Sequence, residues 1–130
     1  FRLEAEGKRI VYATDVELNA IFEPDTPSDS MAALADEYRE FIADVDLLIA
    51  DGQYTEEEYT KKKGWGHTSV PLLLKIAHEQ RVKQLAVFHH DPEHSDMLLD
   101  DLWHQVAPAY RNTTPPMNVF WAREGMTVEI

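Results

Sequence analysis

The 130-residue chain contains no cysteine. Without thiols it can form neither disulfide bonds nor thiolate metal sites, so any transition metal must be bound by imidazole and carboxylate groups. Six histidines and 24 acidic residues can supply such groups. The absence of cysteine also fits the reducing cytoplasm, which is the compartment we expect for this chain.

The sequence has little basic charge and no long apolar runs. No segment approaches the roughly 18 apolar residues that a membrane span needs, and no basic region followed by an apolar one opens the chain. The net charge of −12 argues against a broad basic face that binds nucleic acid or an anionic membrane. We therefore expect a soluble domain that contacts no membrane and binds no long nucleic acid.

Apolar periodicity and turn signals predict the order hairpin, helix, strand, helix, strand, helix, hairpin. The expected ranges are 1–14, 30–43, 46–50, about 68–80, 82–88, 96–106 and 117–130. The first hairpin turns at Gly7-Lys8, and the last has strands at 117–121 and 126–130. Residues 52–66 are polar and indicate a solvated loop or a short helix. The pattern predicts a layered α/β domain without fixing its strand order.

Polar side chains follow three of these strands. Asp15, Asp51 and His89 each stand where an apolar β run ends, and α/β sheets form sites at such strand ends. Asp15 and His89 are candidate metal ligands, because a residue placed there projects from a rigid element. The alternatives are a turn-capping aspartate and a buried histidine with satisfied hydrogen bonds.

The segment 89–96 is dense in potential ligands, with three imidazoles and three carboxylates. If the strand ends one position later, His90 or His94 could be the ligand in place of His89. His78 and His104 lie in helical patterns and are read as surface or core-edge residues. The lysine run 61–63 is read as a solvated charged face, with phosphate contact as the alternative.

Four segments in this order resemble one known family. IVYATD (10–15), LLIADGQY (47–54), GHTS (66–69) and LAVFHHDP (85–92) are similar to the ribonuclease Z-like, phosphodiesterase-like branch of the metallo-β-lactamase superfamily. The resemblance covers about residues 1–105. It implies an α/β fold corresponding to the C-terminal half of the four-layer αββα domain, with a mixed sheet and helices on one face. The family's His-x-His-x-Asp-His motif belongs to the N-terminal half and is absent from this chain.

The resemblance also assigns roles to four residues. Asp15 corresponds to the carboxylate that bridges two metal ions, and His89 to an imidazole ligand of the second ion. Asp51 and His67 correspond to an acid that orients an imidazole, and the imidazole donates a proton to a leaving group or stabilises a phosphoryl oxygen. The implied cofactors are two divalent ions, with zinc favoured over manganese or iron.

These features predict part of a metal-dependent hydrolase that acts on a small or cyclic phosphodiester. Asp15 and His89 are only two ligands, so the chain alone is expected to be inactive and to need the N-terminal half for the other ligands. Half of such a fold leaves an apolar sheet face open, which predicts pairing with that half or self-association. The alternatives are a sensory or scaffold domain without hydrolysis, and a non-phosphodiester hydrolase or iron oxidoreductase of the same superfamily.

Overall fold

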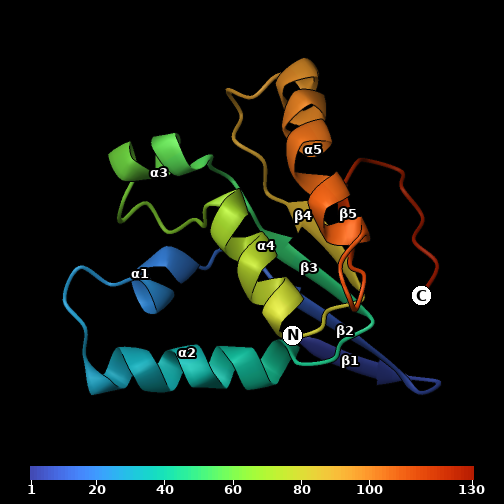
Figure 1. Ribbon diagram of the computed structural model, residues 1–130, viewed down its shortest axis with the longest axis horizontal. Helices are drawn as coiled ribbons and strands as arrows, with labels where there is room; N and C mark the ends of the chain where they lie inside the picture. The colour runs from blue at the N-terminus through green and yellow to red at the C-terminus, as the bar shows by residue number, and fades with distance from the viewer.

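Five strands form one mixed sheet in the computed structural model, which describes residues 1–130. The strands are β1 (Arg2–Ala5), β2 (Lys8–Ala13), β3 (Leu47–Asp51), β4 (Gln84–Phe88) and β5 (Asn118–Trp121). They lie side by side in chain order, with β1 antiparallel to β2 and all other neighbours parallel. The carboxyl ends of β2 to β5 therefore meet at one edge of the sheet, which faces the two short helices in Figure 1.

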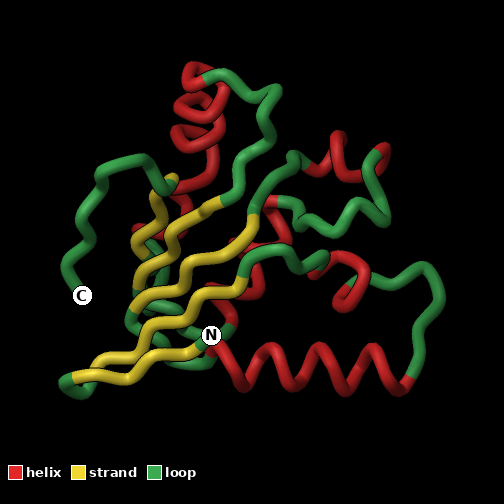
Figure 2. Tube along the Cα trace, turned by 180° about the vertical axis from the view of Figure 1, so that it is seen from behind, coloured by secondary structure: helices red, strands yellow, loops and turns green.

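Five helices connect or flank these strands. They are α1 (Leu18–Phe22), α2 (Asp29–Ile42), α3 (Glu56–Lys61), α4 (Val70–Glu79) and α5 (Asp96–Arg111). Each connection between parallel strands leads to the next strand in the same direction across the sheet. Because such crossover connections are almost always right-handed, their helices lie on the same face of the sheet. The view from behind shows the strands uncovered by helices (Figure 2).

The hydrophobic core lies between this helical layer and the sheet. Leu48 and Leu85 from the two central strands are fully buried against it. Helix α4 is apolar almost all round and buries Leu73, Leu74 and Ile76, as expected of a helix surrounded by other elements. Burial of each such side chain contributes about 1.5–3 kcal/mol, so α4 and the central strands form the most stable part of the domain.

The opposite sheet face carries a different set of apolar side chains. Tyr12, Ile49, Phe88 and Phe120 alternate with the helix-facing residues of their strands, and none of them belongs to the helix-packed core. Tyr12 and Phe88 form an aromatic pair with ring centroids 6.3 Å apart, although they are 41% and 38% exposed. We call the side formed by these four residues the open sheet face.

The predicted α/β class and mixed sheet are confirmed, with helices on one face (Figures 1 and 2). The first hairpin, the two buried strands and the three main helices are also confirmed. Ser28 caps α2 by accepting a hydrogen bond from the Met31 amide. The polar segment 52–66 contains the short helix α3, which begins with a capping box at Thr55 and Glu58.

Three predicted details were incomplete or wrong. The sequence patterns did not predict α1. Helix α5 ends at Arg111 instead of residue 106 and continues through Pro108, because Ala107 is fully buried and the Trp103 indole donates to the Val119 carbonyl. Residues 126–130 form no strand, so the closing hairpin is absent.

The C-terminal tail runs back along the sheet, where the Glu129 carbonyl accepts a hydrogen bond from Gln84. None of the five helices combines the length and the apolar character that crossing a membrane requires.

Candidate metal centre

Four side chains that can ligate a metal converge at the carboxyl edge of the sheet. Asp15 follows β2, Asp51 is the last residue of β3, and His89 follows β4 directly. His67 comes from the loop before α4. One potential ligand atom from each residue lies within 4.8 Å of those from the other three, so the four form one group. All four residues expected at the site are therefore brought together.

Asp51 is at the centre of this group. Its Oδ2 lies 2.7 Å from Nδ1 of His67 and 3.4 Å from Nδ1 of His89. The other ring nitrogen of His89, Nε2, lies 3.7 Å from Oδ1 of Asp15. The imidazole rings of His67 and His89 are neighbours, with centroids 4.6 Å apart and ring planes inclined at 50°. One buried carboxylate therefore contacts both histidines, and the second carboxylate completes the group.

Two polar atoms of the group are buried without a hydrogen-bond partner. They are Oδ1 of Asp51, whose residue is 1% exposed, and Nδ1 of His89. Burial raises the pKa of Asp51, and the hydrogen bond and charge of His67, the charge of His89 and a backbone hydrogen bond from Asp15 offset this effect only in part. A buried polar atom without a partner typically costs about 1–3 kcal/mol. A bound cation would remove this cost, and that is the first sign that the group fits a metal ion.

The chemistry of the donors also fits. Two imidazoles and two carboxylates suit zinc, and manganese or iron can take the same donors. A tetrahedral ion with bonds of about 2.1 Å holds its donors about 3.4 Å apart. When each residue contributes one ligand atom, the four atoms lie within 4.8 Å of one another, a spread somewhat wider than this value. The side chains would therefore have to move closer together to surround an ion.

Gly52 allows the backbone to approach closely beside Asp51. Its amide donates to the Phe88 carbonyl at 3.2 Å, which joins the ends of β3 and β4. A Cβ atom at Gly52 would lie 2.5 Å from Cγ1 of Val87 and 3.1 Å from Cδ2 of Leu73. Only glycine leaves room for this packing, and the packing sets the spacing between Asp51 and His89.

Substitution of Gly52 by alanine is expected to lower the free energy of unfolding by about 1–3 kcal/mol, the usual cost of overpacking a core. Urea unfolding followed by circular dichroism would measure the change. Because the added methyl group pushes β3 and β4 apart, metal binding should weaken as well. A variant as stable as the parent would contradict the close approach at this position.

The remaining histidines do not join the group. His90 contacts the Ala122 carbonyl and packs against Trp121, whereas His94 pairs with Oε1 of Glu58 at 2.8 Å. The end of β4 at Phe88 therefore favours His89 as the candidate ligand over His90 and His94. His78 packs on Tyr110, and His104 packs beside Trp103 on α5.

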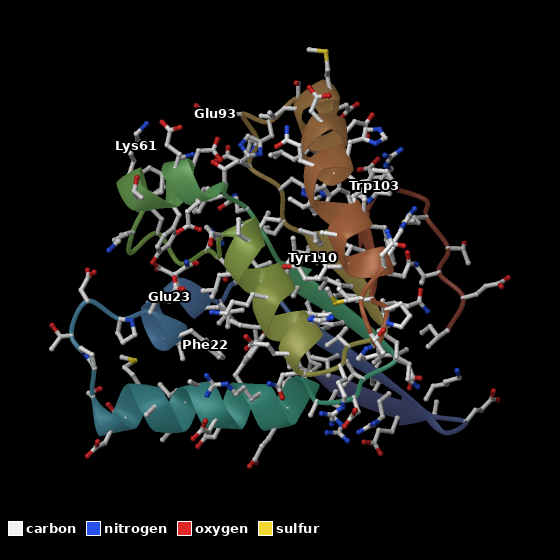
Figure 3. The ribbon with its side chains drawn as sticks, viewed as in Figure 1. Phe22, Glu23, Lys61, Glu93, Trp103 and Tyr110 are labelled. Carbon is white, nitrogen blue, oxygen red and sulfur yellow. The ribbon has the colours of Figure 1, made fainter.

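The lysine run 61–63 does not present free cations. The three side chains pair with Glu57, Asp91 and Asp25, in that order along the chain. Lys61 lies on the outer side of α3 (Figure 3). These pairs agree with the interpretation as a charged face and leave no lysine of the run unpaired for a phosphate.

A hollow of about 540 Å³ adjoins Asp15. Aromatic side chains dominate its walls, and no basic residue lines it. The lining residues besides Asp15 are Phe1, Tyr12, Ala13, Thr14, Val16, Tyr38 and Phe41. A neutral, apolar group of a ligand would fit such surroundings next to the carboxylate.

The sequence patterns did not indicate Glu17, an acidic residue that binds the loop preceding His67. The Glu17 carboxylate accepts hydrogen bonds from the amides of Gly64 and Gly66, just before His67 in the chain. Its partners are 47 and 49 residues away, so no local pattern could have indicated them.

No family model, no curated protein and no solved structure matches the chain. The case for a function therefore depends on the geometry of Asp15, Asp51, His67 and His89.

Proposed function

We propose that these four residues form the site of one divalent transition-metal ion, with zinc as the favoured metal, in a metal-dependent phosphodiesterase. The observation that carries the proposal is the convergence of four donors around the buried, unpartnered Oδ1 of Asp51. A structural ion-pair cluster would be expected to satisfy such an atom with a hydrogen bond. The metal site is thus the simplest explanation for a polar group of this composition at a strand-end edge.

The four residues have two kinds of role in this proposal. Asp15, His89 and the free Oδ1 of Asp51 would ligate the metal, which when bound would supply Lewis-acid chemistry by lowering the pKa of water and neutralising charge on phosphoryl oxygens. Asp51 holds Nδ1 of His67 at 2.7 Å and so fixes the ring orientation. This leaves Nε2 of His67 to face a substrate, where it donates a proton to the leaving group.

Two features support a small phosphodiester as the substrate. The hollow beside Asp15 has the volume of a typical small-molecule pocket and would receive one apolar substituent of the ester. The net charge of −12 and the paired lysines disfavour a long polyanion. A second ion would need donors beyond these four residues, and in our proposal an N-terminal half of the fold supplies them.

Metal titration of the purified chain tests the proposal directly. After treatment with a chelator, calorimetry with zinc should show one ion bound per chain, and elemental analysis should find the same ratio after dialysis. The full-length gene product should hydrolyse bis(p-nitrophenyl) phosphate, whereas the present chain alone should not. Absence of zinc binding would refute the metal site, and binding without turnover in the full-length product would favour a scaffold or sensory role.

The open sheet face supports the further proposal that another polypeptide layer covers it. Large apolar faces on isolated chains tend to associate. For the present chain alone, we propose that a second copy takes this place, because its Tyr12 and Phe88 rings remain partly exposed side by side. The N-terminal half of the fold would take the same place in a longer protein.

Light scattering coupled to size exclusion should therefore give a mass above the 15.0 kDa of one chain. Substitution Tyr12→Lys should shift the measured mass towards that of the monomer, because association would then bury the lysine charge between the two copies. The matched control is Leu34→Lys on α2, a residue 45% exposed against 41% for Tyr12 but away from the sheet. A stable monomer at all concentrations, or equal effects of both variants, would refute association through this face.

A further inference from the structure

Two segments distant in sequence are joined beside the metal centre. Residues 16–19 follow Asp15, and residues 64–69 include His67. Thr68 Oγ1 donates to the Val16 carbonyl at 2.5 Å and accepts from the Leu18 amide at 3.0 Å. Asn19 and Ser69 exchange two hydrogen bonds, of 2.8 and 3.0 Å. We call these contacts, together with those of Glu17, the Glu17 seam.

Glu17 makes the most contacts in this seam. Its Oε1 accepts from the Tyr59 hydroxyl and the Gly64 amide, both at 2.8 Å. Its Oε2 accepts from the Gly66 amide at 2.9 Å. One carboxylate therefore binds three donors that come from α3 and from the loop after it.

The loop that carries His67 depends on such a partner. Gly64 and Gly66 adopt φ values of 80° and 90°, a conformation that L side chains rarely adopt, and neither residue lies in a helix or strand. Their amides take part in no helix or strand hydrogen bonding, and they donate to the Glu17 carboxylate instead. Without this partner the loop would lose the contacts that select one conformation.

We propose that Glu17 is a positioning residue, which holds His67 against Asp51 and couples its loop to the segment of Asp15. The inference rests on the proposed metal function and adds to it a residue outside the metal ligands. His67 lies between Gly66, which is bound by Glu17, and Thr68, which is bound by Val16 and Leu18. The residues before and after His67 are therefore both hydrogen-bonded to the segment that follows Asp15.

The chemistry of the seam requires a carboxylate at this position. Three donors face Glu17, and its two oxygens offer enough acceptor sites for all of them. A glutamine would have one acceptor oxygen, and its NH2 group would face at least one backbone N–H. Glu17→Gln keeps the size of the side chain, so its effect reports the loss of acceptors and not a cavity.

The experiment compares Glu17→Gln with Glu57→Gln in the same chain. Glu57 is an exposed acid on α3 that pairs only with Lys61, so its replacement changes the net charge equally without touching the seam. Cobalt(II) replaces zinc as a spectroscopic probe, and NMR of the histidine rings in the metal-free protein follows His67 directly. We expect Glu17→Gln to weaken cobalt binding about tenfold, the lower end of the loss seen when a side chain that orients a metal site is removed, and to shift the His67 ring resonances. Glu57→Gln should change neither.

A lower melting temperature with unchanged cobalt affinity and unchanged His67 resonances would show a merely structural role and overturn the inference. If the parent chain binds no cobalt, the metal function fails, but the ring resonances still test whether Glu17 positions His67. Should Glu17→Gln not fold, Tyr59→Phe removes one of the three donors and should displace the His67 resonances in the same direction by less. Unchanged resonances in that variant would also overturn the inference.

Discussion

Replacement of His89 by alanine is expected to weaken zinc binding by more than about 100-fold. Loss of a side chain that only hydrogen-bonds to a metal ligand costs about 10- to 100-fold in metal affinity, and loss of a ligand should cost more. His89 lies between the two carboxylates of the group, 3.4 Å from Asp51 and 3.7 Å from Asp15. Without it the remaining atoms would be two carboxylates and one histidine already bonded to Asp51.

A competition titration against a chelating dye would measure this loss. The matched control is His90→Ala, which removes the neighbouring imidazole but leaves the group intact, because His90 contacts Ala122 instead. Asp15→Ala should behave like His89→Ala. If His89→Ala binds zinc as tightly as the parent, or if His90→Ala weakens binding equally, the assignment of His89 as a ligand is wrong.

Replacement of His67 by alanine should lower phosphodiester turnover of the full-length gene product by about 100- to 10,000-fold, the usual contribution of general acid–base catalysis. Most of the bound metal should remain, because Asp15, Asp51 and His89 are unchanged. Initial rates with bis(p-nitrophenyl) phosphate, together with metal content by elemental analysis, would separate the two effects.

The control for this variant is His104→Gln, on α5 away from the candidate metal centre. It should retain both turnover and metal. Asp51→Asn should reduce turnover as well, since a neutral amide holds the His67 ring less firmly than the carboxylate does. If His67→Ala loses its metal as fully as His89→Ala, then His67 is a ligand and the proton-donor role is refuted.

Local sequence signals were sufficient for most of the secondary structure. The apolar periodicity of residues 30–43 and the apolar runs of β3 and β4 predicted elements that the structure contains. Prediction failed where tertiary contacts override local preference. Pro108 would ordinarily end a helix, yet the burial of Ala107 keeps α5 intact around it. The tail after Trp121 has strand-like residues, but β5 does not pair with it.

The candidate site was predictable to a different degree for each residue. Asp15, Asp51 and His89 follow strands, and the ends of adjacent parallel strands must meet at one edge. His67 comes from a loop, so its inclusion depended on a family resemblance and not on periodicity. The distance of 2.7 Å to Asp51 and the partners of Glu17 join residues 16 to 49 positions apart, and no local pattern contains that information.

By itself, the sequence determined the α/β class, the exclusion of thiolate chemistry and the carboxylates and imidazole at three strand ends. Each of these follows from composition or from the spacing of neighbouring residues. Only the tertiary structure brought His67 onto Asp51, left one oxygen of that carboxylate buried without a partner, and bound the His67 loop to Glu17. These contacts join distant segments, and their geometry exists only once the helices and strands have packed together.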